Sequence, residues 1–106
     1  MSYCIVFSTA GSQAEADKIA AALLSARAAS CVQMAAIKSA YHWKGKVEHA
    51  DEIHLTIKTR DGLYPMVEKI IRANHSYETP QVVKVAIGDG LPAYLDWIRA
   101  ETKKGE

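Results

Sequence analysis

The apolar residues of this chain recur at two spacings, and each spacing predicts one kind of element. Four segments are rich in β-branched or other apolar residues and are predicted to be strands; they cover residues 3–9, 31–38, 53–58 and 82–87. In the third, Ile53, Leu55 and Ile57 alternate with polar residues, which indicates a strand with one exposed face. In the first and fourth, both alternating sets are largely apolar, which is typical of strands covered on two faces.

Three other segments carry apolar residues three and four positions apart, as one face of a helix does. They are expected from Ser12 to about Ala29, from Leu63 to Ala73, and from Pro92 onward. Ser12 and Glu15 fit a capping box, in which the hydroxyl and the carboxylate satisfy amides of the first turn. Pro65 fits only the first turn of the second helix, because proline lacks the N–H that a helix interior needs.

The remaining segments are predicted to be turns and loops. A turn is expected near Ser39, ahead of a short apolar stretch at 40–43, and a bulge or bend at Lys44-Gly45. A loop follows the second helix at 74–80, and the sequence Gly-Asp-Gly at 88–90 indicates a turn before the last helix. These breaks divide the chain into the strands and helices given above.

The order strand, helix, strand, strand, helix, strand predicts a ferredoxin-like α+β sandwich with an added C-terminal helix. Residues 1–106 are expected to form a single domain, because no repeat or linker interrupts them. In this fold the helices cover one face of the sheet, and a solvated second face is polar. Here Ile5 and Phe7 alternate with Cys4 and Val6, so both faces are apolar, and no segment is left over to cover the second. A further copy of the chain is therefore expected there, in a closed symmetric assembly.

Composition and charge exclude several classes of protein. Apolar residues make up 49% of the chain, which suits a globular core. Thirteen basic and twelve acidic residues give a net charge of +1 without a basic stripe, so no nucleic acid is expected as a partner. No apolar run approaches the roughly 20 residues that cross a membrane, and no signal-peptide pattern opens the chain. The sequence therefore predicts a cytoplasmic protein whose cysteines stay reduced.

The histidines are the first candidates for metal binding, although none has a spacing that is diagnostic of a metal site. They are His42, His49, His54 and His75. His49 lies among acidic residues, which indicates a solvated turn, and His54 lies on the polar side of its predicted strand. His75 closes the second helix, so a structural role, in which the helix C-terminus stabilises an imidazolium, and a ligand-binding role both stay open.

Cysteines and aromatic residues are the other candidates. Cys4 and Cys31 lie in apolar strands without a basic neighbour and are predicted to act as small hydrophobic residues. A copper site would be chemically feasible if the fold brought the two thiols together, since thiolates suit Cu(I). Tyr41 and Trp43 lie with two lysines at the predicted bend, and such a cluster favours an interface. No motif of a catalytic nucleophile or carboxylate pair is present, so the residues alone predict a small oligomeric α+β domain.

Ordered blocks along nearly the whole chain resemble the CutA family of divalent-cation tolerance proteins. They are A-A-S-C-V at 28–32, Y-H-W-K-G-K-V at 41–47, E-I-H-L-T-I-K-T at 52–59, H-S-Y-E-T-P at 75–80 and A-Y-L-D-W-I at 93–98. The resemblance implies a ferredoxin-like fold assembled as a tight homotrimer, similar in architecture to the nitrogen-regulatory PII proteins. It also implies a cytoplasmic protein that is linked to copper tolerance and binds divalent copper.

Carried over position by position, the resemblance implies a binding cleft between subunits. Its residues would be Tyr41, Trp43, Lys46, Glu52, Lys58, Tyr77 and Glu78. The family's assigned copper site uses a Cys of the first strand and two adjacent His, and here Ser8, Asn74 and His75 stand at these positions. One ligand of three is kept, so His75 is the predicted metal ligand, with weak copper binding by one imidazole from each of three subunits.

Two functions follow as hypotheses. The first is a non-enzymatic, homotrimeric CutA-like protein that binds copper or another divalent metal weakly and acts in the response to metal ions. The alternative is a PII-like signalling trimer that binds a small anionic metabolite or nucleotide at clefts between subunits. Catalysis by a fold-similar acyl-phosphate hydrolase is not expected, because no Arg lies in the first loop, where an anion-binding catalyst needs one.

Overall fold

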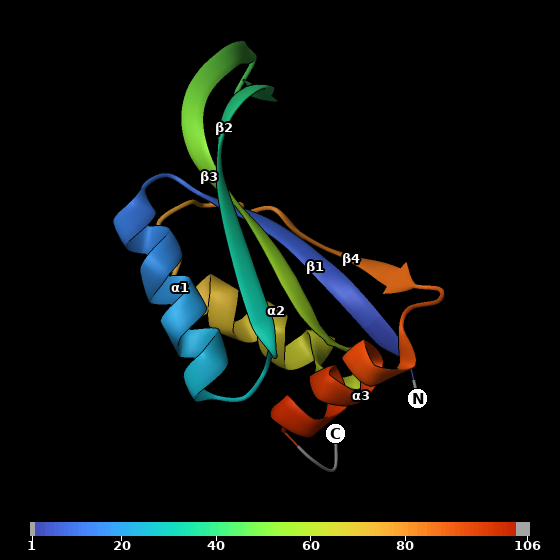
Figure 1. The fold of residues 1–106 in the computed structure, drawn as a ribbon. Helices are drawn as coiled ribbons and strands as arrows, with labels where there is room; N and C mark the ends of the chain where they lie inside the picture. The colour runs from blue at the N-terminus through green and yellow to red at the C-terminus, as the bar shows by residue number, and fades with distance from the viewer. Residues whose placement is uncertain (1, 104–106) are drawn as a thin grey trace.

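The computed structural model describes residues 2–103, which form a four-stranded antiparallel sheet and three α-helices (Figure 1). The strands are β1 (Tyr3–Ala10), β2 (Cys31–Trp43), β3 (Lys46–Arg60) and β4 (Val82–Ile87). The helices are α1 (Gln13–Ser25), α2 (Tyr64–Ala73) and α3 (Pro92–Glu101), and a 3-10 turn at Asp61–Leu63 precedes α2. No helix within this described range is long and apolar enough to span a membrane. The predicted α+β order with an added C-terminal helix is confirmed.

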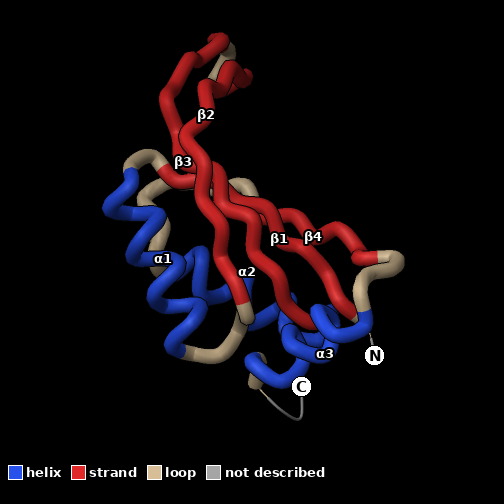
Figure 2. Tube along the Cα trace, in the orientation of Figure 1, coloured by secondary structure: helices blue, strands red, loops and turns tan. Residues whose placement is uncertain are grey.

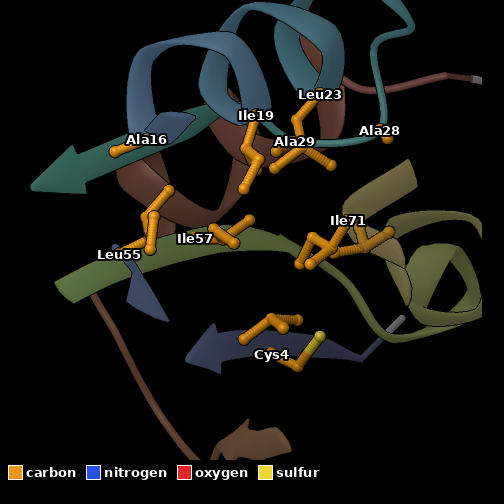
Figure 3. Close-up of a cluster of buried hydrophobic side chains, with 12 residues drawn as sticks. Cys4, Ala16, Ile19, Leu23, Ala28, Ala29, Leu55, Ile57 and Ile71 are labelled. Carbon is orange, nitrogen blue, oxygen red and sulfur yellow. The ribbon is translucent and has the colours of Figure 1, made fainter. Parts of the chain in front are cut away.

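The sheet has the strand order β2-β3-β1-β4, and α1 and α2 pack on one of its faces (Figure 2). The core between these layers is made of alternate residues of β1 and β3 and the inner sides of the two helices. Val6 lies opposite Ile57 in the register, and both are fully buried. Figure 3 shows Ile19 and Leu23 of α1 above this layer. The hydrophobic effect acting on this one face fixes which side of each strand points inward.

Helix α1 begins as predicted and ends earlier than predicted. The Ser12 hydroxyl accepts a 3.1 Å hydrogen bond from the Glu15 amide, which confirms the N-cap. The helix stops at Ser25 because Arg27 adopts a left-handed conformation with φ 54°, and the Ala28 amide then bonds to the carbonyl of Leu23 at 3.0 Å. This is a Schellman motif, which glycine usually closes. With arginine at that position, the sequence carried no stop signal, and the predicted end at about Ala29 is wrong.

Strands β2 and β3 continue beyond the rest of the sheet as a two-stranded ribbon, here called the arm (38–51). Strand β1 pairs with β3 only as far as Ala10 opposite Ile53, and Figure 1 shows the arm projecting away from the helices. Lys44 and Gly45 form its two-residue turn, with φ 49° and 80° as a type I′ turn requires. The predicted turn near Ser39 is wrong. Since the arm is covered on neither face within one chain, its sequence lacks the alternation by which a strand is recognised.

The second face of the sheet is partly covered by α3, which corrects the prediction that no segment of the chain lies there. The Tyr94 ring of this helix lies 5.6 Å from Lys58 Nζ, on the face away from α1 and α2. The apolar part of that face is left open. Val83 and Val85 of β4 are each 48% exposed. The chain alone therefore leaves an apolar surface on one half of the sheet.

Candidate functional site

A groove of about 800 Å³ lies between the arm and the loop that follows α2. Residues 38–43 of the arm form one wall and residues 77–81 of the loop form the other, with Thr9 and Glu52 also in the lining. Two segments that are distant in the sequence meet here because β1 ends at Ala10, which leaves the base of the arm open to the loop. The groove combines aromatic rings with carboxylates, a lysine and an imidazole.

Most residues predicted for the binding cleft meet in this groove. Those in its lining are Tyr41, Trp43, Glu52, Tyr77 and Glu78. The two predicted lysines lie elsewhere in the single chain. Lys46 is an exposed residue beside the turn of the arm, and Lys58 donates to Gln33 Oε1 at 2.7 Å on the open face of the sheet. Within one chain, the groove therefore contains the carboxylates of Glu52 and Glu78 but neither of the two lysines that were predicted for an anion-binding cleft.

A hydrogen bond between Tyr77 and Glu52 joins the two sides of the groove. The Tyr77 hydroxyl donates to Glu52 Oε2 at 2.8 Å, and Glu52 is only 7% exposed. Burial, together with this bond and the charge of Glu52, raises the pKa of Tyr77 to about 12. The ring packs closely against Gly11, where a Cβ would lie 3.2 Å from the Tyr77 oxygen, so a larger residue there would push the ring aside by a few tenths of an ångström. The phenol is therefore held protonated as the donor to a buried carboxylate.

His75 has a buried side chain, and both of its ring nitrogens are in use. Nε2 lies 2.6 Å from the carbonyl oxygen of Thr9, and the Tyr77 amide lies 3.1 Å from Nδ1. Because a carbonyl only accepts and an amide N–H only donates, these bonds assign the neutral tautomer with the proton on Nε2. The side chain of His75 is fully buried. In this conformation His75 ties the loop to the end of β1.

The residues at the expected copper position do not offer a ready metal site. The Ser8 hydroxyl donates to the carbonyl of Gln81 at 2.7 Å, and the Asn74 amide donates to the carbonyl of Ile70 at 2.8 Å. A metal ion at His75 would have to displace one of the two bonds of that imidazole. No group of three or more His, Cys, Asp or Glu side chains positioned to hold a metal occurs within residues 2–103. Copper binding at His75 stays a prediction.

Glu15 has a second role that the sequence did not reveal. Its carboxylate accepts a 3.0 Å hydrogen bond from the Ser76 amide and lies 3.5 Å from the Gly11 amide and 3.7 Å from His75 Nδ1. Burial alone would raise the pKa of Glu15, but the hydrogen bonds from Ser76 and Gly11 outweigh burial and lower it. A capping box predicts only the local bond, whereas the contact with Ser76 spans 61 positions. No local sequence pattern predicts a contact between residues that far apart.

The two cysteines are free thiols that the fold keeps apart. Cys4 is buried on the face of the sheet that α1 and α2 cover. Cys31 is half-buried and lies opposite Lys58, on the other face. Burial raises the pKa of Cys4 to about 11, with Asp61 adding to the rise, so this thiol stays protonated. The condition for a shared copper site at these thiols is not met within one chain.

Comparisons with known proteins place the chain beside one family. The model of the family described as CutA1 divalent ion tolerance protein matches residues 4–101. The chain is 41% identical over 93 residues to the divalent-cation tolerance protein CutA of Archaeoglobus fulgidus, a match that covers 88% of this chain and 91% of that protein. It is 36% identical over 98 residues to protein CutA of Mus musculus, covering 92% of this chain and 55% of that protein. The chain thus spans about half the length of this mouse relative.

Solved structures of similar proteins share the fold. The structure of the periplasmic divalent cation tolerance protein CutA from Archaeoglobus fulgidus superposes with a TM-score of 0.93 at 38% identity, covering 95% of this chain and 99% of that one. CutA1 from Oryza sativa gives a TM-score of 0.95 at 31% identity, with 99% and 97% covered. The divalent cation tolerance protein from Thermus thermophilus gives a TM-score of 0.92 at 34% identity, with 95% and 99% covered.

Proposed function

The chain belongs to the CutA1 divalent ion tolerance protein family, and we propose that it acts as a homotrimer in the response to divalent cations. In this proposal it binds copper weakly, catalyses no reaction and works in the cytoplasm. Relatives of the chain are named divalent-cation tolerance proteins, which supports a role in the response to divalent cations. Because these names are not those of enzymes, they also support a function without catalysis. Its free thiols suit a reducing compartment. The observation that carries the trimer is that one chain leaves a sheet face and an arm uncovered.

The uncovered sheet face is the first support for self-association. Ile5 of β1 lies beside Val85 of β4, and Phe7 lies beside Val83, so these side chains form one apolar patch. Burying such a patch stabilises an assembly by roughly 25 cal/mol for each Å² of apolar area removed from water. A contiguous exposed apolar patch is also how an interaction surface is recognised. A second copy of the same chain is the occupant that needs no further component.

The arm is the second support. A two-stranded ribbon alone is marginally stable in water, and this one exposes Tyr41, Trp43 and Val47. Aromatic side chains of this kind bury a large area at protein interfaces while the hydroxyl or indole N–H stays hydrogen-bonded. In a closed ring of three, each arm has a neighbouring subunit to pack against. The number three comes from the family resemblance.

Weak copper binding is the third part of the proposal. An imidazole is a good ligand for Cu²⁺, which has the highest affinity among the common divalent metals for such a site. At His75 the metal would replace either the bond of Nε2 to Thr9 or the bond that Nδ1 accepts from Tyr77. The loss of that bond offsets part of the binding free energy, which supports weak and not tight binding.

The alternative of a PII-like signalling trimer is not favoured. Its anionic ligand would bind in the groove beside the arm, but Glu52 and Glu78 are part of that lining. Glu78 is itself paired with Lys44 at 3.7 Å, which reduces the positive charge that a phosphate or carboxylate would meet. Binding an anion next to a buried carboxylate costs free energy, because the two negative charges repel each other.

The mass in solution tests the proposal. Light scattering of the purified full chain at micromolar concentration is expected to give three times the 11.6 kDa of one chain. Binding of Cu²⁺ is expected in the same sample by calorimetry. A particle of one chain at micromolar concentration would overturn the assembly, and the absence of any Cu²⁺ binding would overturn the metal part. The two outcomes are independent of each other.

A further inference from the structure

Glu52, at the base of the arm, is a buried carboxylate without a counter-charge. It is 7% exposed, and no side chain among residues 2–103 forms an ion pair with it. The hydrogen bond from Tyr77 reaches only Oε2. The other oxygen, Oε1, is not enclosed by protein, because the enclosed side-chain polar atom without a partner in this range is Nη2 of Arg60. Burying a charge in this way costs free energy, which a positively charged donor at Oε1 would offset.

The register places the side chain of Glu52 on the groove side of the arm. Glu52 lies opposite Ile37, and such partners share a face of the ribbon, as do alternate residues of one strand. Tyr41 and Trp43 are alternate residues counted from Ile37, so both share the face of Glu52, and all three line the groove. Tyr77 lines it from the loop. Three aromatic side chains therefore accompany the open carboxylate oxygen.

Lys44 shows what such groups bind at the end of the groove nearest the arm turn. Its Nζ lies 5.5 Å from the centre of the Trp43 ring and 3.7 Å from Glu78 Oε1. An ammonium in this position is attracted by the ring face and by the carboxylate. Glu78 therefore has a counter-charge within the chain, whereas Glu52 at the other end of the arm has none among residues 2–103.

The other lysines of the arm do not supply that charge. Lys38 lines the groove, but it pairs with Asp51 at 3.2 Å. These two lie opposite each other, one position away from the pair that contains Glu52, so their side chains point to the other face of the arm. Lys46 shares the groove face but lies beside the turn, outside the lining. A cation from outside the chain would complete the charge balance at Glu52.

We propose that the groove binds a small organic cation, in which a primary ammonium group is carried on an apolar chain. The ammonium donates to Glu52 Oε1 in a charge-assisted hydrogen bond, and the apolar chain lies along the rings of Tyr41 and Trp43. A groove of about 800 Å³ with aromatic walls and a few polar groups has the size of a small-molecule site. The inference goes beyond the proposed function, because it requires neither copper nor His75.

A ligand in the groove is compatible with the proposed trimer. None of the four residues of the apolar patch on the sheet lines the groove. On the arm, Val47 and Glu52 are separated by an odd number of positions in β3, so their side chains lie on opposite faces. A neighbouring subunit can therefore cover the patch and the Val47 face while the face of Glu52 holds the ligand.

A series of head groups tests the charge on the wild-type protein. The probes are n-hexylammonium, n-hexanol and hexanoate, which carry alkyl chains of similar length, and calorimetry with the full chain gives their affinities. We expect n-hexylammonium to bind at least about tenfold more tightly than n-hexanol, because its hydrogen bond to Glu52 is between charged groups. Hexanoate is expected to bind least. Equal affinities for n-hexylammonium and n-hexanol would overturn the inference.

Substitutions then test the residues. Glu52→Gln keeps an acceptor for Tyr77 but removes the charge, and it is expected to lower the affinity for n-hexylammonium by about tenfold or more. Glu78→Gln is the matched control, because Glu78 lines the same groove but is exposed and paired with Lys44. This control is expected to stay within about twofold of the wild type. Tyr41→Leu is expected to weaken binding a few fold, whereas Tyr41→Phe, which keeps the ring, is not.

Tryptophan fluorescence gives a second readout. The chain has two tryptophans, so in a Trp97→Phe background the emission reports on Trp43 alone, and n-hexylammonium is expected to change it. Light scattering checks that each variant keeps the wild-type mass. Equal affinity in wild type and Glu52→Gln would overturn the inference. So would the absence of n-hexylammonium binding, as when a lysine of a neighbouring subunit already satisfies Oε1. A particle of one chain or a lack of Cu²⁺ binding would overturn parts of the proposed function, but neither changes the result expected for n-hexylammonium.

Discussion

The hydroxyl of Tyr77 donates a 2.8 Å hydrogen bond to Glu52 Oε2, and this bond closes the base of the arm against the loop after α2. The two residues are 25 positions apart. Neither residue belongs to the hydrophobic core, so the bond stabilises the groove and not the packing of the helices on the sheet. The loop is fixed at its other end by His75 on the carbonyl of Thr9. Together these contacts attach the loop to the base of the arm and to the end of β1.

Replacing Tyr77 by Phe is expected to destabilise the protein by about 1–3 kcal/mol, because Glu52 is left as a largely buried carboxylate without this donor. The measurement is urea denaturation at neutral pH. Tyr41→Phe is the control, because Tyr41 lines the same groove but is exposed. A change in Tyr77→Phe no larger than in the control would mean that the bond contributes nothing to stability.

The same phenol predicts a loss of stability at alkaline pH. Burial and the contact with Glu52 raise the pKa of Tyr77 from its ordinary 10.0 to about 12 in the folded protein. A group with a raised pKa stabilises the folded state fully below its unfolded pKa and loses this contribution as the pH rises toward the folded value. Stability is therefore expected to fall between about pH 10 and 12. In Tyr77→Phe this fall should be smaller, and identical profiles would contradict the assignment.

The lowered pKa of Glu15 predicts how the stability of the folded protein changes at acid pH. Its pKa lies below the ordinary 4.5, because bonds from Ser76 and Gly11 outweigh burial. A lowered pKa contributes stability that is present above the unfolded value and lost as the pH falls through the folded one. The wild type is therefore expected to lose more stability below pH 4.5 than Glu15→Gln does. Thermal melts from pH 6 to pH 3 check this, with Asp17→Asn on the exposed side of α1 as control.

The open sheet face predicts how to dissociate the assembly. Val85→Lys places a charge in the apolar patch and is expected to reduce the light-scattering mass to that of one chain at micromolar concentration. Leu24→Lys is matched in exposure, with 45% for Leu24 against 48% for Val85, but it lies on α1. The control is expected to keep the mass of the wild type. Dissociation by both variants, or by neither, would show that this face is not the interface.

The arm turn predicts a stabilising substitution. Lys44 has φ 49°, a left-handed conformation that costs roughly 1–2 kcal/mol for most L-residues. Asn tolerates this conformation, and Lys44→Asn would create the Asn-Gly pair that type I′ turns prefer. Stability is expected to rise by up to about 1 kcal/mol in urea denaturation, since the exposed pair with Glu78 contributes little. Lys46→Asn, in the extended strand of the same arm, is expected to give no gain.

Local features of the fold were predictable where one face of an element is buried. The strand at 82–87 was predicted with its observed ends, as was the start of the last helix at Pro92. The arm was not, because neither of its faces is covered in one chain, and the polar pair at Lys38-Ser39 therefore indicated a break. The end of α1 was missed for a different reason: arginine stands where a glycine would have marked the cap.

The sequence by itself determined the order of the elements and the residues of the core, because a helix or strand with one buried face repeats its apolar residues at a period that neighbours in the chain reveal. Only the tertiary structure decided which residues form the groove, because they come from segments that are distant in the sequence. The contact of Glu15 with Ser76 spans 61 positions and that of His75 with Thr9 spans 66. It likewise decided the position of α3 on the second face. Such contacts depend on where the folded chain brings distant segments together, and no local spacing encodes that.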